Sequence, residues 1–155
     1  MGSHSARKVN KEDYMKLQTA KTMLRYAKQY MDLGQLKVVQ TDEDWIYIPN
    51  YKAIGVAEHI PQDEIEWEKW MITYIKETFD YEIALEHMEI FSLFHELGHH
   101  MCGDICTPEE YNMLVQEIDD DDNYGYRQIP DEKAADTFAV EFLKEHMTNL
   151  LELNK

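Results

Sequence analysis

Residues 94–103 of the chain read FHELGHHMCG, so that His95 and His99 lie four positions apart and Glu96 directly follows the first histidine. In an α-helix, residues four apart lie within about 40° of each other around the axis, and both imidazole rings can therefore reach one ion. Glu96 lies about 100° from His95, beside such an ion, where its carboxylate can take a proton from an attacking water. The stretch predicts a zinc site with His95 and His99 as ligands and Glu96 as general base.

The flanking residues predict that this stretch lies on a helix. Gly103 is a natural helix end, and Asp80 is the expected beginning. His100 points about 100° away from His99, so we expect a surface or packing role for it. A buried stripe along the helix is expected from residues spaced alternately by four and three, namely Ile83, His87, Ile90, Phe94, Leu97 and Met101.

A third protein ligand, which a catalytic zinc site of this kind requires, is offered by a final helix that Pro130 opens and that is predicted over residues 131–151. Glu132 and Asp136 are four apart on one face of this helix. We expect Glu132 to bind the metal and Asp136 to accept the outer N–H of a ligand histidine. The alternative is that Glu132 is only an acid in the first turn, where the helix dipole favours it. Positions expected to face the core are Ala135, Phe138 and Phe142.

The rest of the chain predicts an α+β fold with a small antiparallel sheet. Apolar periodicity predicts a first helix over residues 11–33, ended by Gly34, and a second over residues 62–79 after Pro61. Residues 104–131 are expected to be an acidic connection. Short β-branched and aromatic runs predict strands at residues 36–39, 45–48 and 53–58. We expect one domain over residues 11–155, preceded by a disordered N-terminus or expression remnant at residues 1–10.

The two segments HELGHH (95–100) and EKAADTFA (132–139) together resemble the ImmA/IrrE family of zinc metallopeptidases. That family has a Glu-x-x-Ala-Asn/Asp-x-Phe-Ala signature after its HExxH helix, which is matched here by Glu132, Ala135, Asp136, Phe138 and Ala139. The resemblance implies a minimal gluzincin-like, zincin-type fold. It also implies zinc-dependent endopeptidase activity on a cytoplasmic regulator, commonly a DNA-binding repressor of a mobile element or stress response.

Charge limits the possible partners of this chain. Its 155 residues include 15 Lys and Arg against 31 Asp and Glu, a formal net charge of −16. Direct binding to a phosphate backbone needs clustered cations, so we expect no nucleic-acid binding and favour a basic protein substrate. No signal-peptide core or membrane-spanning run is evident, and we expect a cytoplasmic protein.

Other polar residues leave alternatives open. The two cysteines, Cys102 and Cys106, are expected to be free thiols packed as small apolar groups, because a bridge between them would close a very short loop. Residues 119–122 are expected to form a solvated acidic loop. Candidates for the donor that stabilises the oxyanion during peptide hydrolysis are His59, Tyr111, Tyr124 and Tyr126.

A second class of function is compatible with the acidic composition. The chain could be a non-enzymatic binding protein, an antirepressor or DNA mimic, in which the metal site is structural or vestigial. Metal content and the effect of Glu96→Gln discriminate between this class and a peptidase.

Overall fold

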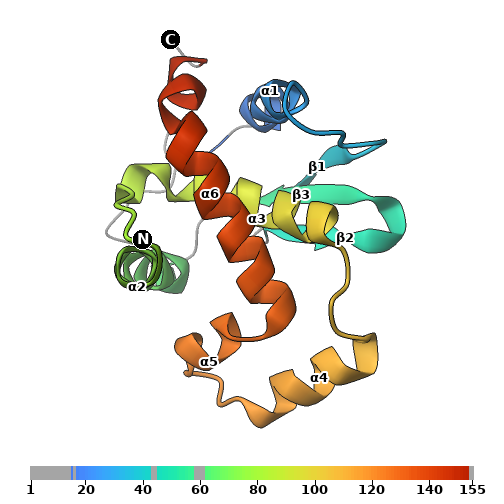
Figure 1. The fold of residues 1–155 in the computed structure, drawn as a ribbon, viewed down its shortest axis with the longest axis vertical. Coiled ribbons are helices and arrows are strands. Elements are labelled where there is room, and N and C mark those ends of the chain that lie inside the picture. The colour runs from blue at the N-terminus through green and yellow to red at the C-terminus, as the bar shows by residue number, and fades with distance from the viewer. Residues whose placement is uncertain (1–14, 16, 43–44, 58–61, 154–155) are drawn as a thin grey trace.

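The computed structural model describes residues 15, 17–42, 45–57 and 62–153, which form helices around a small sheet (Figure 1). In chain order the elements are α1 (Leu17–Ala27), β1 (Lys37–Thr41), β2 (Ile46–Ile48), β3 (Ala53–Ala57), α2 (Gln62–Phe79), α3 (Met88–Cys102), α4 (Pro108–Glu117), α5 (Asn123–Arg127) and α6 (Pro130–Glu152). Short 3-10 turns, η1 (Pro49–Tyr51) and η2 (Leu85–His87), precede β3 and α3. The predicted α+β class is confirmed.

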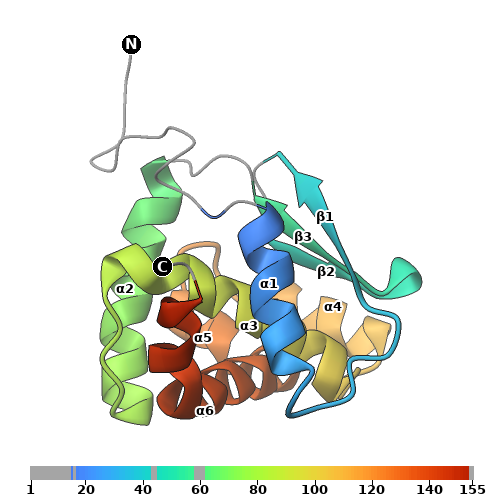
Figure 2. The ribbon, with the colours of Figure 1, turned by 90° about the horizontal axis from the view of Figure 1, so that it is seen from above.

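Helix α3 lies at the centre of the fold. It contacts α6 on one side and β2 and β3 on the other, while α2 lies on the side away from the sheet (Figures 1 and 2). Every residue from Met88 to Gly98 is buried. The predicted stripe is buried at Ile90, Phe94 and Leu97, and the other faces of the helix are buried as well, because this helix lies at the centre of the fold. His95 is among these buried residues, whereas His99 is partly exposed.

The predicted beginning of α3 at Asp80 was also wrong. Asp80 has a positive φ of 54°, which ends α2 in a left-handed turn, and α3 starts only at Met88 after η2. Ile83 is buried, but it belongs to the segment between the two helices. The apolar spacing continued across a break in the backbone that periodicity alone does not detect.

The sheet is mixed rather than antiparallel, with strand order β1-β3-β2. Strand β3 pairs in parallel with β1 and antiparallel with β2. All five residues of β3 are buried, whereas β1 and β2 are more exposed, so the most apolar strand takes the centre of the sheet. The predicted antiparallel pairing is wrong for β1 and β3, because the pattern of residues along the chain indicates where strands form but not which strands are neighbours in the sheet. As a result β2 is an edge strand next to α3.

The predicted helix over residues 62–79 is confirmed as α2, although Pro61 lies outside the described residues. The first helix is shorter than the predicted 11–33, because α1 ends at Ala27 and a turn follows. Residues 11–14 and 16 of that prediction, and the N-terminal expectation for residues 1–10, lie outside the described part of the chain. None of the helices in the described residues is long and apolar enough to cross a membrane.

The predicted connection over residues 104–131 contains two helices, so that expectation was wrong. Helix α4 begins with a capping box, in which the Thr107 side chain accepts from the Glu110 backbone and the Glu110 side chain accepts from the Thr107 backbone. Asp122 caps α5 by accepting from Gly125 N at 2.9 Å. The four acids at residues 119–122 are exposed, as expected of a solvated loop.

Helix α6 packs against α3 at very short range. A Cβ built on Gly98 would lie 2.9 Å from both the Cα and the carbonyl oxygen of Ala135, so these backbones touch. One helical turn away, Phe94 stacks on Phe142 with ring centroids 4.8 Å apart. Of the positions predicted to face the core, Ala135 and Phe142 are buried and Phe138 packs against the core from a partly buried position. This close approach brings the start of α6 next to the histidines of α3.

Candidate metal centre

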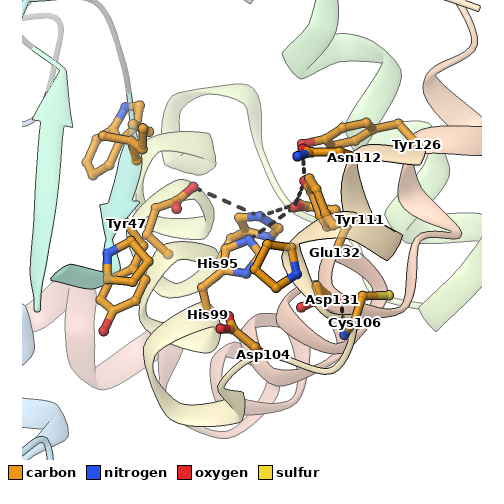
Figure 3. A pocket seen from close by; sticks show the side chains of 15 residues that line it. Tyr47, His95, His99, Asp104, Cys106, Tyr111, Asn112, Tyr126, Asp131 and Glu132 are labelled. Carbon is orange, nitrogen blue, oxygen red and sulfur yellow. Dashed lines mark hydrogen bonds and ion pairs between the residues drawn. The ribbon is translucent and has the colours of Figure 1, made fainter. Parts of the chain in front are cut away.

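Three side chains from two helices converge at one point (Figure 3). His95 and His99 project from α3, Glu132 projects from the first turn of α6, and one ligand-type atom of each lies within 4.8 Å of the others. His95 Nε2 lies 3.1 Å from Glu132 Oε1, and His99 Nε2 lies 3.4 Å from Glu132 Oε2. These are the three residues that the sequence predicted as ligands.

The spacing of these donor atoms suits a metal ion. Ligands placed tetrahedrally at about 2.0–2.1 Å from an ion lie about 3.3 Å from one another. The two nitrogen–oxygen distances, 3.1 and 3.4 Å, are close to that value, but they end on different oxygens of Glu132. Two imidazole nitrogens and one carboxylate oxygen also form a donor set that divalent transition metals favour. This group could therefore hold a metal ion.

Glu96 lies beside the three-residue group and not within it. Its Oε2 is 3.9 Å from His95 Nε2, and its side chain is buried. Burial raises the pKa of Glu96 above its usual range, although the nearby His95 and His99 oppose this. A buried carboxylate with a raised pKa, facing the same space as the histidines, is suited to accept and return a proton.

Asp136 contacts the His95 ring on the side that faces away from Glu132. Its Oδ1 lies 2.8 Å from His95 Nδ1, so the ring nitrogen that faces away from Glu132 has a carboxylate partner. The two groups lie at ion-pair distance, but His95 Nδ1 forms no hydrogen bond with the described residues, so the predicted N–H donation to Asp136 stays a prediction. Asp136 is fully buried and is also bound by Arg127, which the sequence analysis did not single out. Nothing in the local sequence distinguishes Arg127 from an exposed arginine.

The electrostatics of the centre bring a proton onto His95 in the absence of a metal. Burial alone would lower the pKa of His95, but Asp136 and Glu132 outweigh it and raise the pKa to about 10. Burial would likewise raise the pKa of Glu132, but His95 and His99 hold it well below its usual range. Glu132 is therefore an anion at neutral pH, as a metal-ligating carboxylate must be.

Tyrosines from the two unpredicted helices complete the centre. Tyr111 of α4 donates to Glu132 Oε2 at 2.7 Å, and its hydroxyl lies 2.8 Å from that of Tyr126 in α5. Burial, together with the carboxylate of Glu132, raises the pKa of Tyr111. Of the other oxyanion candidates, Tyr124 is 61% exposed with its ring against Tyr74, and His59 lies outside the described residues.

A cleft with two lobes opens at the centre. One lobe, of about 570 Å³, extends along β2 and α4, and the other, of about 280 Å³, extends toward α2 and α5. Figure 3 shows Tyr47 of β2 on one side of the histidines and Tyr111 and Tyr126 on the other. The residues that line both lobes are Trp45, His95, Glu96, Tyr126 and Glu132. Two of the candidate metal ligands, His95 and Glu132, therefore lie where the two lobes meet, and His99 lines the larger lobe.

The remaining predicted polar residues lie outside the centre. His100 has a packing role, as expected, because its ring nitrogens lie 2.8 Å from the Tyr47 hydroxyl and 2.9 Å from the Leu33 carbonyl oxygen. Both cysteines are free, which confirms that prediction. Cys102 is exposed, however, so the expectation that the thiols pack as buried apolar groups was wrong for it.

Comparison with known proteins does not add to this geometry. No protein-family model matches the chain, and neither the curated proteins nor the solved structures contain a match.

Proposed function

We propose that this protein is a zinc-dependent endopeptidase that cleaves a basic cytoplasmic protein such as a DNA-binding repressor. The observation that carries the proposal is the convergence of His95, His99 and Glu132, with Glu96 beside them, at the junction of a two-lobed cleft. When bound, zinc supplies Lewis-acid polarisation of the attacking water and of the substrate carbonyl. The resemblance of HELGHH and EKAADTFA to ImmA/IrrE peptidases supports the same reaction class.

The residues of the chain would each have a separate role in the remaining steps of the reaction. Glu96 takes the proton of the attacking water and returns it to the leaving amine. His95, His99 and Glu132 hold the ion, and Asp136 orients the His95 ring through Nδ1. Burial of these groups excludes bulk water and strengthens their electrostatic interactions.

The shape of the cleft favours cleavage within a chain. Because a lobe extends on each side of the centre, a polypeptide can lie on both sides of the bond to be cut. The edge strand β2 borders the larger lobe through Ile46 and Tyr47, and an edge strand can pair with an extended peptide. The acidic groups that line this lobe, which include Asp104, favour a basic substrate.

The first test is metal binding as a function of pH. We expect about one zinc ion per chain, bound more tightly as the pH rises, because zinc must displace the proton from His95. With a pKa of about 10 for His95, the group is protonated in the metal-free protein throughout the neutral range. The Kd for zinc should therefore fall about tenfold per pH unit between roughly pH 7 and 9. Chelator competition at several pH values measures this dependence.

A matched experiment checks the source of the pH dependence. Calorimetry in buffers of different ionisation enthalpy should show about one proton released per zinc at pH 8. If the protein binds no zinc, the peptidase assignment fails and the acidic binding protein becomes the better interpretation. Tight binding without proton release would contradict the charge state assigned to His95.

The hydrogen-bond chain from Tyr126 through Tyr111 to Glu132 favours Tyr126 as the oxyanion donor. An ionised Glu132 can only accept, so the Tyr111 proton is committed to it, and Tyr111 must then accept from Tyr126. Of these two tyrosines, only Tyr126 can turn its proton toward a reacting carbonyl without breaking the contact to Glu132. We expect Tyr126→Phe to lower kcat by about 10²- to 10³-fold.

The control for this prediction is Tyr124→Phe, which changes an exposed tyrosine two residues away on the same short helix. It should leave kcat unchanged, and both variants should bind zinc as the wild type does. An unchanged kcat in Tyr126→Phe would remove Tyr126 from the reaction.

A further inference from the structure

Arg127 is a buried cation at the last position of α5. Its side chain is 4% exposed, and it donates twice to one carboxylate, from Nε to Asp136 Oδ2 at 2.9 Å and from Nη2 to Asp136 Oδ1 at 2.6 Å. A planar guanidinium matches a carboxylate in this two-bond arrangement, which fixes the orientation of both groups. Asp136 therefore has a defined direction within a fully buried site.

The carboxylate held by Arg127 is also the partner of His95. Asp136 Oδ1, which receives the Nη2 bond, lies 2.8 Å from His95 Nδ1. When His95 is neutral and its proton is on Nδ1, facing this carboxylate, it presents the lone pair of Nε2 on its other side, toward Glu132. The three side chains form a line from α5 through α6 to α3, with the candidate metal position at its end.

Two rings hold the guanidinium itself in place. Arg127 Cζ lies 5.5 Å from the centroid of the Tyr126 ring and 5.9 Å from that of Trp67 in α2. Rings at these distances attract a cation, and they also prevent the side chain from taking other rotamers. The Nη2 atom remains 3.9 Å from Glu132 Oε1, too far for a hydrogen bond, so the close contacts of Arg127 are with Asp136.

We infer that Arg127 is a positioning residue of the metal centre, and that it acts through Asp136 to direct Nε2 of His95 toward the ion. This inference rests on the proposed function for its metal, but it concerns side-chain geometry that can be measured with or without zinc. A residue that only stabilised the fold would be replaceable without any specific effect on the His95 ring.

A double-mutant cycle on zinc affinity tests the inference. Arg127→Met and Asp136→Asn should each weaken zinc binding by about 10- to 100-fold. If Arg127 acts through Asp136, the double variant should bind zinc with about the same affinity as the single variant that binds it less tightly. Fold losses that multiply would show that Arg127 acts independently and would overturn the inference. Arg25→Met, at an exposed arginine of α1, is the control and should bind zinc normally.

A second measurement uses NMR of the ring protons and remains informative if zinc binding fails. The Nδ1–H proton of His95, which lies at ion-pair distance from Asp136, should give a slowly exchanging downfield signal in the metal-free and in the zinc-loaded protein. Arg127→Met should shift or broaden this signal, and Arg127→Lys, which keeps the charge but loses the two-bond fork, should do so to a lesser extent. An unchanged signal in both variants overturns the inference. Absence of zinc binding in the wild type would instead overturn the proposed function.

Discussion

Replacement of Glu96 with glutamine is expected to lower kcat by about 10²- to 10⁴-fold while zinc content stays at one ion per chain. The amide has almost the same shape as the carboxylate but cannot take a proton from the attacking water. Glu96 lies 3.9 Å from His95 Nε2 and is not one of the three grouped ligands, so the substitution should leave the metal in place. Peptide cleavage and metal analysis on the same sample measure the two effects.

The control for this substitution is Glu89→Gln, because Glu89 is a buried glutamate on the same helix. It accepts a hydrogen bond from Met15 N at 2.9 Å, which a glutamine oxygen can still accept. Glu89→Gln should retain activity. If Glu96→Gln cleaves substrate as fast as the wild type, Glu96 is not the general base. The alternative function, a non-enzymatic acidic binding protein, would then be favoured.

The substitution Gly98→Ala is expected to weaken zinc binding by roughly 10-fold without altering any predicted ligand. The new Cβ would meet the Cα and carbonyl oxygen of Ala135 at 2.9 Å, and backbone atoms cannot rotate out of the way. Alanine gains about 1 kcal/mol in helix propensity over glycine, but overpacking of this kind costs typically 1–3 kcal/mol, so the clash should dominate. Relief requires α6 to move away from α3, and Glu132 would move with it.

Gly103→Ala separates this effect from a general loss of stability. Gly103 has a positive φ of 71° at the end of α3, so alanine is strained there, but no atom lies within 4 Å of the added Cβ. We expect Gly103→Ala to lower the thermal midpoint while leaving zinc affinity close to that of the wild type. Equal zinc affinity in both variants would show that the α3–α6 contact does not set the ligand geometry.

The sequence was most informative about those site residues whose roles depend on their spacing along a helix. His95, His99 and Glu132 were predicted from intervals of four along single helices, and the fold brings them within reach of one another. Arg127 could not be predicted, because its importance comes from burial between Trp67 and Tyr126 and from a contact with the next helix. Such contacts between elements leave no periodic signal in the chain.

The same limit explains the errors in the fold. Strand positions followed from β-branched residues, but β3 inserts between β1 and β2, an order that no local pattern specifies. The start of α4 was visible in principle, because Thr107 and Glu110 form a capping box and Pro108 occupies the first turn. The many acidic residues around positions 119–122 favoured the prediction of a loop, so the helix that follows this capping box was not predicted.

Helix α4 buries none of its residues, although it forms one wall of the cleft. A segment with so little apolar burial opens locally at a small free-energy cost, far below that of global unfolding. We therefore expect amide hydrogens of α4 to exchange with solvent faster than those of α3. Each opening would separate Tyr111 from Glu132 and widen the passage to the histidines. The width of the cleft is then a fluctuating quantity, which would ease the entry of a loop of a folded protein.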